Sequence, residues 1–305
     1  MDNNSRKWIY LIVLSLIWGS SYILIKRGLE GLSPIQLGAV RIVFSTIFLF
    51  TIGHRSLFRI KKAQWPWIAW SALFGTFLPV FLFAYAETEI DSSIASILNS
   101  LVPVFTIFLG FLIFKIHFTR NQIFGVILGL AGAAILIFEG ANLNPDQNYF
   151  FALLVIIAAL CYAANANIIK SKLQDVSSTG IAVGNFAVML GPALICLAFS
   201  GLLDAEVLQD EQVQESLLYI VVLSIVGTGL AKILFNKLIQ ISTAVFSTSV
   251  TYLIPIVGIF WGVLDDEPFT MIHVFASGII LTGVYLVNRD SKNKKKRLTS
   301  KSTSS

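Results

Sequence analysis

Charged side chains are scarce in this sequence. Asp, Glu, Lys and Arg make up 13% of its 305 residues, compared with roughly 25% in an average soluble domain. Hydrophobic residues make up 56%, and the few charges gather in short stretches that leave long apolar runs between them. Because a run of about 20 apolar residues crosses the hydrocarbon core of a bilayer, the composition excludes a soluble globular protein and predicts a polytopic membrane protein.

Cysteine and the common catalytic motifs are also nearly absent. The two cysteines, Cys161 and Cys196, both lie in apolar runs without metal-ligand spacing, which is typical of small apolar filler. There is no HExxH, no GxSxG and no glycine-rich phosphate loop, and the three histidines are far apart in the sequence. We therefore expect no enzyme, no metal and no cofactor. The lack of repeated charged rings argues against a channel.

Ten apolar runs are long enough to be membrane spans. We expect them at residues 8–25, 34–53, 66–86, 92–114, 121–138, 149–169, 178–201, 216–239, 243–264 and 270–288. A basic N-terminal region and a small-residue site near Gly19 are also compatible with a cleaved signal peptide, but the apolar run resumes after that site. The fold class that follows is an all-α polytopic membrane protein with ten transmembrane helices.

The basic residues are sorted between the loops, and short cytoplasmic loops are enriched in Lys and Arg. With a cytoplasmic N-terminus, the outer loops contain only Lys26 and Arg27 and otherwise carry acids, whereas the inner loops are basic. We expect both termini in the cytoplasm and a multi-pass protein of the bacterial cell (inner) membrane. The tail at 289–305 is basic and rich in Ser and Thr, which favours a disordered segment beside the anionic leaflet over a nucleic-acid-binding segment.

Four segments of the first half have counterparts in the second half. The segment pairs are 15–34 with 159–178, 75–83 with 227–235, 96–110 with 248–262, and 118–136 with 269–286. They predict two five-helix repeats, at 1–140 and 149–288. Because five spans are an odd number, the second repeat enters the membrane from the opposite side, an inversion found in secondary transporters. A segment that recurs within the chain is not a signal peptide, so 8–25 remains a span.

These features resemble the ten-helix drug/metabolite transporter superfamily, in particular its EamA-type branch. The resemblance covers residues 8–288 and is carried by Trp18-Gly19-Ser20, Arg41, Pro103, Pro255 and the five-plus-five layout. It implies a central cavity between the halves, export of small metabolites and no prosthetic group. One departure is that the fourth span ends in Lys115, where the family often has an acidic residue.

Several polar and aromatic residues recur at helical spacing inside the spans. The candidate substrate-binding residues are Trp18, Tyr22, Asn99, Tyr162, Asn165, Thr228, Lys232, Asn236 and Tyr252. For the asparagines, lining a cavity and bonding between helices are about equally favoured. Lys232 lies about seven residues, or roughly 10 Å, inside its span, and either binds a solute or extends toward the membrane interface. For Arg41 we favour a structural bond to helix ends, and for Ser96, Ser100 and Thr248 close packing of helices.

No Asp or Glu falls near the centre of a span. Exporters of lipophilic cations require an embedded carboxylate, whereas a buried ammonium favours a carboxylate partner. We therefore expect a secondary transporter of small metabolites such as amino acids, related zwitterions or anions. The alternatives are an exporter of lipophilic drugs or cations and a non-transporting membrane receptor or structural subunit. Expected partners are a small-molecule substrate and membrane lipid, with no nucleic acid, and the protein is expected to be a monomer or homodimer.

Overall fold

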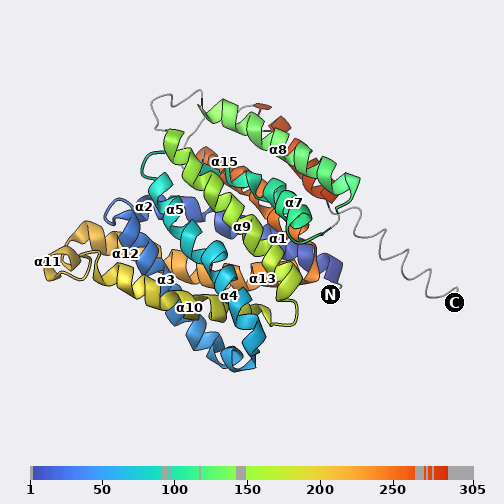
Figure 1. Ribbon diagram of the computed structural model, residues 1–305. Helices are drawn as coiled ribbons and strands as arrows, with labels where there is room; N and C mark the ends of the chain where they lie inside the picture. Colours follow the sequence, from blue (N-terminus) through green and yellow to red (C-terminus); the bar gives the residue numbers. More distant parts are fainter. Residues whose placement is uncertain are drawn as a thin grey trace.

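The computed structural model describes residues 3–90, 95–96, 98–116, 118–141, 149–264, 271–272, 274–276 and 278–287. In that part of the chain every regular element is a helix (Figure 1). Six helices are long and apolar enough to cross a membrane: Ser5–Gly28, Pro34–Arg59, Lys62–Ala86, Ala152–Lys172, Ser178–Ala198 and Glu211–Ile241. Shorter apolar helices follow at Asn99–Leu112, Ala244–Val257 and Val274–Val287. The predicted class, an all-α polytopic membrane protein, is confirmed.

The first half contains three interrupted helices. Its elements are α1 (Asn3–Gly19), α2 (Ser21–Gly28), α3 (Pro34–Gly53), η1 (His54–Arg59), η2 (Lys62–Gln64), α4 (Trp65–Ala72), η3 (Leu73–Phe77), α5 (Leu78–Ala86), η4 (Asn99–Leu101), α7 (Val102–Leu112) and α8 (Arg120–Ala141). α1 and α2 are separated at Ser20, inside the motif WGSSY. α4 and α5 are joined through η3, which is π-helical, and a 3₁₀ turn precedes α7.

The second half repeats this pattern in outline. Its elements are η5 (Tyr149–Phe151), α9 (Ala152–Lys172), α10 (Ser178–Ala198), α11 (Ala205–Leu208), α12 (Glu211–Val222), η6 (Leu223–Leu230), α13 (Ala231–Ile241), α14 (Ala244–Thr248) and α15 (Val250–Leu264), followed by the helix Val274–Val287. η6 is again π-helical and joins α12 to α13. α14 and α15 are separated at Ser249. The predicted loop between the repeats, at 142–148, and the tail at 289–305 lie outside the described residues.

Serine residues cap the N-terminus of the second helix in each half. Ser33 Oγ accepts a hydrogen bond from Gln36 N, and Gln36 Oε1 accepts one from Ser33 N at 2.9 Å, so the pair forms a capping box. Ser177 Oγ accepts from Gly180 N at 3.0 Å at the start of α10. These caps satisfy backbone N–H groups that the helix itself leaves unpaired, at points where the chain turns back into the apolar layer.

The two halves interleave. α3 packs along α10, α1 packs against α13 and α15, and α9 packs against α4, α5 and α7 (Figure 1). The first helix of each half therefore packs on the third and fourth helical segments of the other half. α8 meets the helix Val274–Val287 at glycines, since a Cβ added to Gly125 would lie 2.6 Å from Gly283 O. This exchange of partners is the packing expected of two halves related by a twofold axis.

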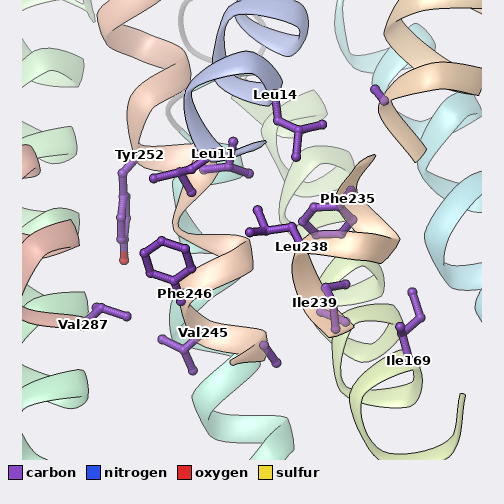
Figure 2. Close-up of a cluster of buried hydrophobic side chains, with 14 of the residues drawn as sticks. Leu11, Leu14, Ile169, Phe235, Leu238, Ile239, Val245, Phe246, Tyr252 and Val287 are labelled. Atoms are coloured by element: carbon purple, nitrogen blue, oxygen red, sulfur yellow. The ribbon is translucent and has the colours of Figure 1, made fainter. Parts of the chain in front are cut away.

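The largest buried cluster lies between these exchanged helices. Figure 2 shows Leu11 and Leu14 of α1 facing Phe235 and Leu238 of α13, with Phe246 of α14 beside them. All five side chains are at most 6% exposed. The close packing of large side chains from both halves fixes how α1 sits on α13, and hence the position of Trp18 one turn further along.

Candidate functional site

A central cavity of about 90 Å³ lies between the halves. Its lining residues are Trp18, Ser21, Tyr22, Ile25, Arg41, Gly75, Thr76, Val80, Phe83, Asn99, Val102, Tyr162, Gly227, Thr228, Lys232, Phe235, Thr248, Val250, Thr251 and Ile254. The volume holds several water molecules and is smaller than the roughly 300–1,000 Å³ of typical ligand sites. A solute of metabolite size therefore requires the surrounding helices to separate.

Six of the nine residues expected from the sequence line this cavity. They are Trp18, Tyr22, Asn99, Tyr162, Thr228 and Lys232. The first three come from the first half and the last three from the second half. The expectation that polar helix faces of both halves meet at one place therefore agrees with the arrangement of these residues.

The other three, Asn165, Asn236 and Tyr252, lie outside the cavity lining. Asn165 Oδ1 accepts a hydrogen bond from Ser71 Oγ at 2.7 Å, and Asn236 Nδ2 donates to the carbonyl of Ser178 at 3.3 Å. Tyr252 is fully buried in the core of Figure 2, where its hydroxyl donates to the Val126 carbonyl at 3.0 Å. Each residue bonds to a neighbouring helix through one polar atom, whereas Asn165 Nδ2 and Asn236 Oδ1 have no hydrogen-bond partner within the described residues. These three residues are left out of the site proposed below.

Both halves place a π-helical segment at a Gly-Thr pair beside the cavity. η3 contains Gly75 and Thr76, and η6 contains Gly227 and Thr228. π segments change the register of the backbone hydrogen bonds and are frequent at functional sites. The apolar runs predict regular α-helices and give no sign of the π-helical turns. The only local signal is that a Gly-Thr pair begins both matched segments, 75–83 and 227–235.

The carbonyls of these two glycines accept hydrogen bonds from the opposite half. Trp18 Nε1 donates to Gly227 O at 3.0 Å, and Lys232 Nζ donates to Gly75 O. The first bond joins α1 to η6, and the second joins α13 to η3. The partly buried indole and the buried ammonium thus obtain partners without an acidic side chain.

The helices approach so closely here that only glycine fits. A Cβ added to Gly75 would lie 2.4 Å from Asn165 Cγ, and one added to Gly227 would lie 2.7 Å from Ser21 Oγ. Ser21 and Asn165 are matched residues of the two repeats. The same contact therefore occurs twice, once with each half supplying the glycine.

Two basic side chains face the cavity. Arg41 Nε donates to Thr228 Oγ1 at 2.8 Å, and the Lys232 ammonium lies 5.8 Å from the centre of the Tyr162 ring. None of the described residues that line the cavity is acidic. Arg41 interacts electrostatically with Glu87, at the end of α5. The sequence favoured a bond from Arg41 to helix ends, whereas the hydrogen bond described here goes to the Thr228 side chain on the cavity wall.

Aromatic rings form two groups on the cavity wall. Trp18 and Phe235 meet edge to face with ring centroids 5.1 Å apart. Phe83 lies 6.0 Å from Tyr22 and 6.1 Å from Tyr162. Phe83 and Phe235 were missed in the sequence because 24 phenylalanines give no single position a distinctive signal.

Unused hydrogen-bonding atoms also face this region. Asn99 Nδ2 donates to Tyr22 Oη at 3.3 Å, but Asn99 Oδ1 and Thr76 Oγ1 have no hydrogen-bond partner within the described residues. Thr248, which the sequence reading assigned to helix packing, lines the cavity at the break between α14 and α15. Among the described residues, no three His, Cys, Asp or Glu side chains are placed to hold a metal ion.

Hydrogen bonds tie the helices together at both ends of the bundle. At one end, Ser216 Oγ donates to Arg27 O at 3.1 Å and accepts from Gly31 N at 3.0 Å. At the other end, Lys170 Nζ donates to Ser242 O at 2.5 Å, and Gln240 Nε2 donates to Val176 O at 2.6 Å. The cavity lies between these two sets of ties.

The EamA-like transporter family matches residues 6–138 and again residues 150–289. An uncharacterized inner membrane transporter of Escherichia coli K12, YedA, is 27% identical over 91% of this chain and 89% of its own length. A protein of the same strain described as "Probable amino-acid metabolite efflux pump" is 25% identical over 92% of this chain and 95% of its own. A solved structure described only as "Crystal structure of protein" shares the fold, with a TM-score of 0.73, 15% identity, and coverage of 95% of this chain and 98% of that chain. With a family match in each half, a common fold and relatives named as transporters, this chain belongs to the EamA-like transporter family.

Proposed function

We propose that the protein exports small metabolites of the amino-acid type, zwitterions or anions, by alternating access of the central cavity to the two sides of the membrane. The observation that carries the proposal is the pair Arg41 and Lys232. They come from opposite halves and face one cavity whose described lining contains no carboxylate. A solute carboxylate would place a negative charge within the cavity itself, in addition to the interaction of Arg41 with Glu87 at the end of α5.

The present hydrogen-bond partners of the two cations are neutral, although Arg41 also interacts electrostatically with Glu87. Lys232 donates to a backbone carbonyl and Arg41 to a threonine hydroxyl. Both present bonds have a charged donor and a neutral acceptor, and a carboxylate acceptor adds the attraction between two full opposite charges. A carboxylate entering the cavity therefore competes well for both cations, and it engages both halves of the protein at once.

The rest of the wall fits the remainder of such a solute. Trp18 and Phe235 offer apolar surface, while Asn99 Oδ1 and Thr76 Oγ1 offer acceptors for an ammonium group. This combination supports a zwitterion with an apolar side chain. It disfavours a lipophilic cation, which would meet two positive charges.

The two sets of hydrogen bonds, one at each end of the bundle, could break in turn and so allow alternating access. Breaking the Ser216 contacts separates the α1–α2 end from α12, and breaking the Lys170 contacts separates α9 from the end of α13. Opening one set while the other stays closed exposes the cavity to one side only. A relative named for amino-acid metabolite efflux supports the solute class, and the inner-membrane relative supports a bacterial inner-membrane location. The cytoplasmic placement of both termini rests on the sorting of Lys and Arg between the loops.

The test is solute flux in proteoliposomes with a panel of radiolabelled amino acids and related anions. Removal of a desolvated contact between a cation and a carboxylate costs about 2–5 kcal/mol, so Lys232→Met should reduce transport roughly a hundredfold or more. Lys232→Arg should retain part of the activity because it keeps the charge. Lys237→Met is the matched control, since Lys237 lies on the same helix outside the cavity lining.

Normal transport by Lys232→Met would contradict the proposal that the Lys232 ammonium binds a carboxylate of the solute. Quaternary ammonium dyes as the best solutes would favour the lipophilic-cation alternative. Chemical conversion of the solute would indicate an enzyme, and binding without flux would indicate a receptor.

A further inference from the structure

A second concave region lies on the side of the bundle, away from the central cavity. It has a volume of about 710 Å³ and is walled by α4, η3, α7 and α9. Its apolar wall includes Trp70, Phe74, Leu109, Leu160 and Ile168. The volume is within the roughly 300–1,000 Å³ of typical ligand sites. We refer to this region as the lateral groove.

The lateral groove exposes apolar side chains on the surface of the bundle, as expected for a surface within the apolar layer of a membrane. Trp70, Leu160 and Ile113, which line it, are 49%, 39% and 60% exposed. Trp70 and Phe74 stack nearly parallel, with ring centroids 5.4 Å apart and an interplanar angle of 13°, and form a flat apolar wall. Exposed apolar residues are ordinary on a membrane protein, so the shape and the charge of the groove, rather than its apolarity, distinguish it.

Two lysines line the same groove. Lys172 is the last residue of α9, and its ammonium lies 5.1 Å from the centre of the Trp67 ring. Lys115 follows the end of α7 and is exposed. None of the described residues that line the groove is acidic. The groove thus combines an apolar wall with a net positive charge, and it lies on the side of the membrane that the sequence predicts to be cytoplasmic.

The backbone at Lys115 is unusual. Its φ is +53°, a left-handed conformation in which glycine or asparagine is normally found. The Ile116 N–H donates to Gly110 O at 2.9 Å and closes the end of α7 around it. A long basic side chain is therefore present at a turn where smaller residues are less strained.

We propose that the lateral groove binds one phospholipid with an anionic headgroup. Lys115 and Lys172 contact the headgroup, and an acyl chain lies along the wall formed by Trp70, Phe74 and Leu160. Basic pockets between transmembrane helices on the cytoplasmic side recognise anionic lipids in this way. Charge complementarity selects the headgroup, while the apolar wall accepts the chain of any phospholipid.

The test uses the full-length protein in detergent, with phosphatidylglycerol and phosphatidylcholine of matched acyl chains as the two probes and native mass spectrometry as the readout. Each lysine near a lipid surface contributes about fivefold in affinity. The variant Lys115→Gln/Lys172→Gln should therefore lose roughly thirtyfold for phosphatidylglycerol, with little change for phosphatidylcholine. Lys61→Gln/Lys62→Gln is the matched control, since both lysines are exposed and lie outside the groove.

A second variant tests the apolar wall without changing any charge. Ala164 lines the groove, so Ala164→Trp should fill it and weaken binding of both lipids, while thermal unfolding verifies that the variant is folded. Equal retention of the two lipids by the wild-type protein would overturn the proposal. So would an equal loss in the two lysine double variants, or unchanged binding by a folded Ala164→Trp. Solute flux does not enter any of these readouts, so the lipid site stands or falls independently of the proposed function.

Discussion

The contact between Gly75 and Asn165 offers a direct test of how the two halves fit together. A Cβ added at Gly75 would lie 2.4 Å from Asn165 Cγ and 2.5 Å from its Nδ2. Ordinary contacts begin at 3.4 Å, so the overlap is about 1 Å. Asn165 is 1% exposed and held by Ser71 Oγ at 2.7 Å. It therefore moves only by breaking that hydrogen bond.

The expected cost of Gly75→Ala follows from these two effects. Overpacking a well-filled interior costs about 1–3 kcal/mol, and the loss of a hydrogen bond costs about 0.5–1.5 kcal/mol. Together they predict a destabilisation of roughly 2–4 kcal/mol. With about 2 °C per kcal/mol for a large chain, the midpoint of thermal unfolding should fall by roughly 4–8 °C.

The matched control is Gly191→Ala in α10. A Cβ added to Gly191 meets nothing within 4 Å, so this variant experiences only the higher helix propensity of alanine, up to about 1 kcal/mol in its favour. The difference between the two variants isolates the steric contact. Both are measured as midpoints of thermal unfolding of the purified protein in one detergent.

A double variant completes a double-mutant cycle for Gly75 and Asn165. In Gly75→Ala/Asn165→Ala the overlapping side-chain atoms are gone, so Gly75→Ala should cost almost nothing in the Asn165→Ala background, although Asn165→Ala itself is destabilising. An interaction energy of about 1–3 kcal/mol is typical of residues in direct contact. If Gly75→Ala unfolds at the same temperature as Gly191→Ala, or if Asn165→Ala does not relieve its cost, the interlocking of the two halves at η3 is wrong.

Two further predictions concern the bond between Trp18 and Gly227 and the orientation of the chain in the membrane. Trp18→Phe keeps a ring against Phe235 but removes the donor to Gly227 O, so it should lower the midpoint of thermal unfolding by about 2 °C. The control Trp70→Phe, at an exposed tryptophan, should leave the midpoint unchanged, and equal midpoints of the two variants would show that the bond contributes nothing. With the native cysteines removed, an impermeant thiol reagent should label Leu208→Cys in intact cells and Lys62→Cys only after permeabilisation, and labelling of Lys62→Cys from outside would reverse the predicted orientation.

The order and approximate extent of the helices could be predicted because apolar run length and loop charge are local properties of the sequence. Cavity residues such as Tyr22 and Tyr162 were found because they lie on matched helix faces. Asn236 does not line the cavity, although it lies four residues after Lys232 on α13. Its amide instead donates to Ser178 O at the start of α10, a contact that depends on the packing of α13 against α10 and not on spacing along one helix.

The lateral groove could not be predicted from local sequence. Lys115 and Lys172 are 57 positions apart in the chain, and only the packing of α7 against α9 brings both to one groove. Similarly, Arg41 bonds to Thr228 across 187 positions. Such pairs depend on how helices from distant parts of the chain pack, and one sequence does not specify that packing.

The two π-helical segments also explain how a nearly symmetric frame produces an asymmetric site. The acceptors, Gly75 O and Gly227 O, are matched positions of the two repeats, but their donors are not: Trp18 is matched by Tyr162, and Lys232 by Val80. Both donors would bond more strongly to a carboxylate than to a carbonyl. The ammonium gains more than the neutral indole, because its full positive charge is also attracted by the full negative charge of the carboxylate. Binding of an anionic group should therefore release the bond to η3 while the Trp18 bond to η6 persists, so that the solute loosens one cross-half contact and leaves the other intact.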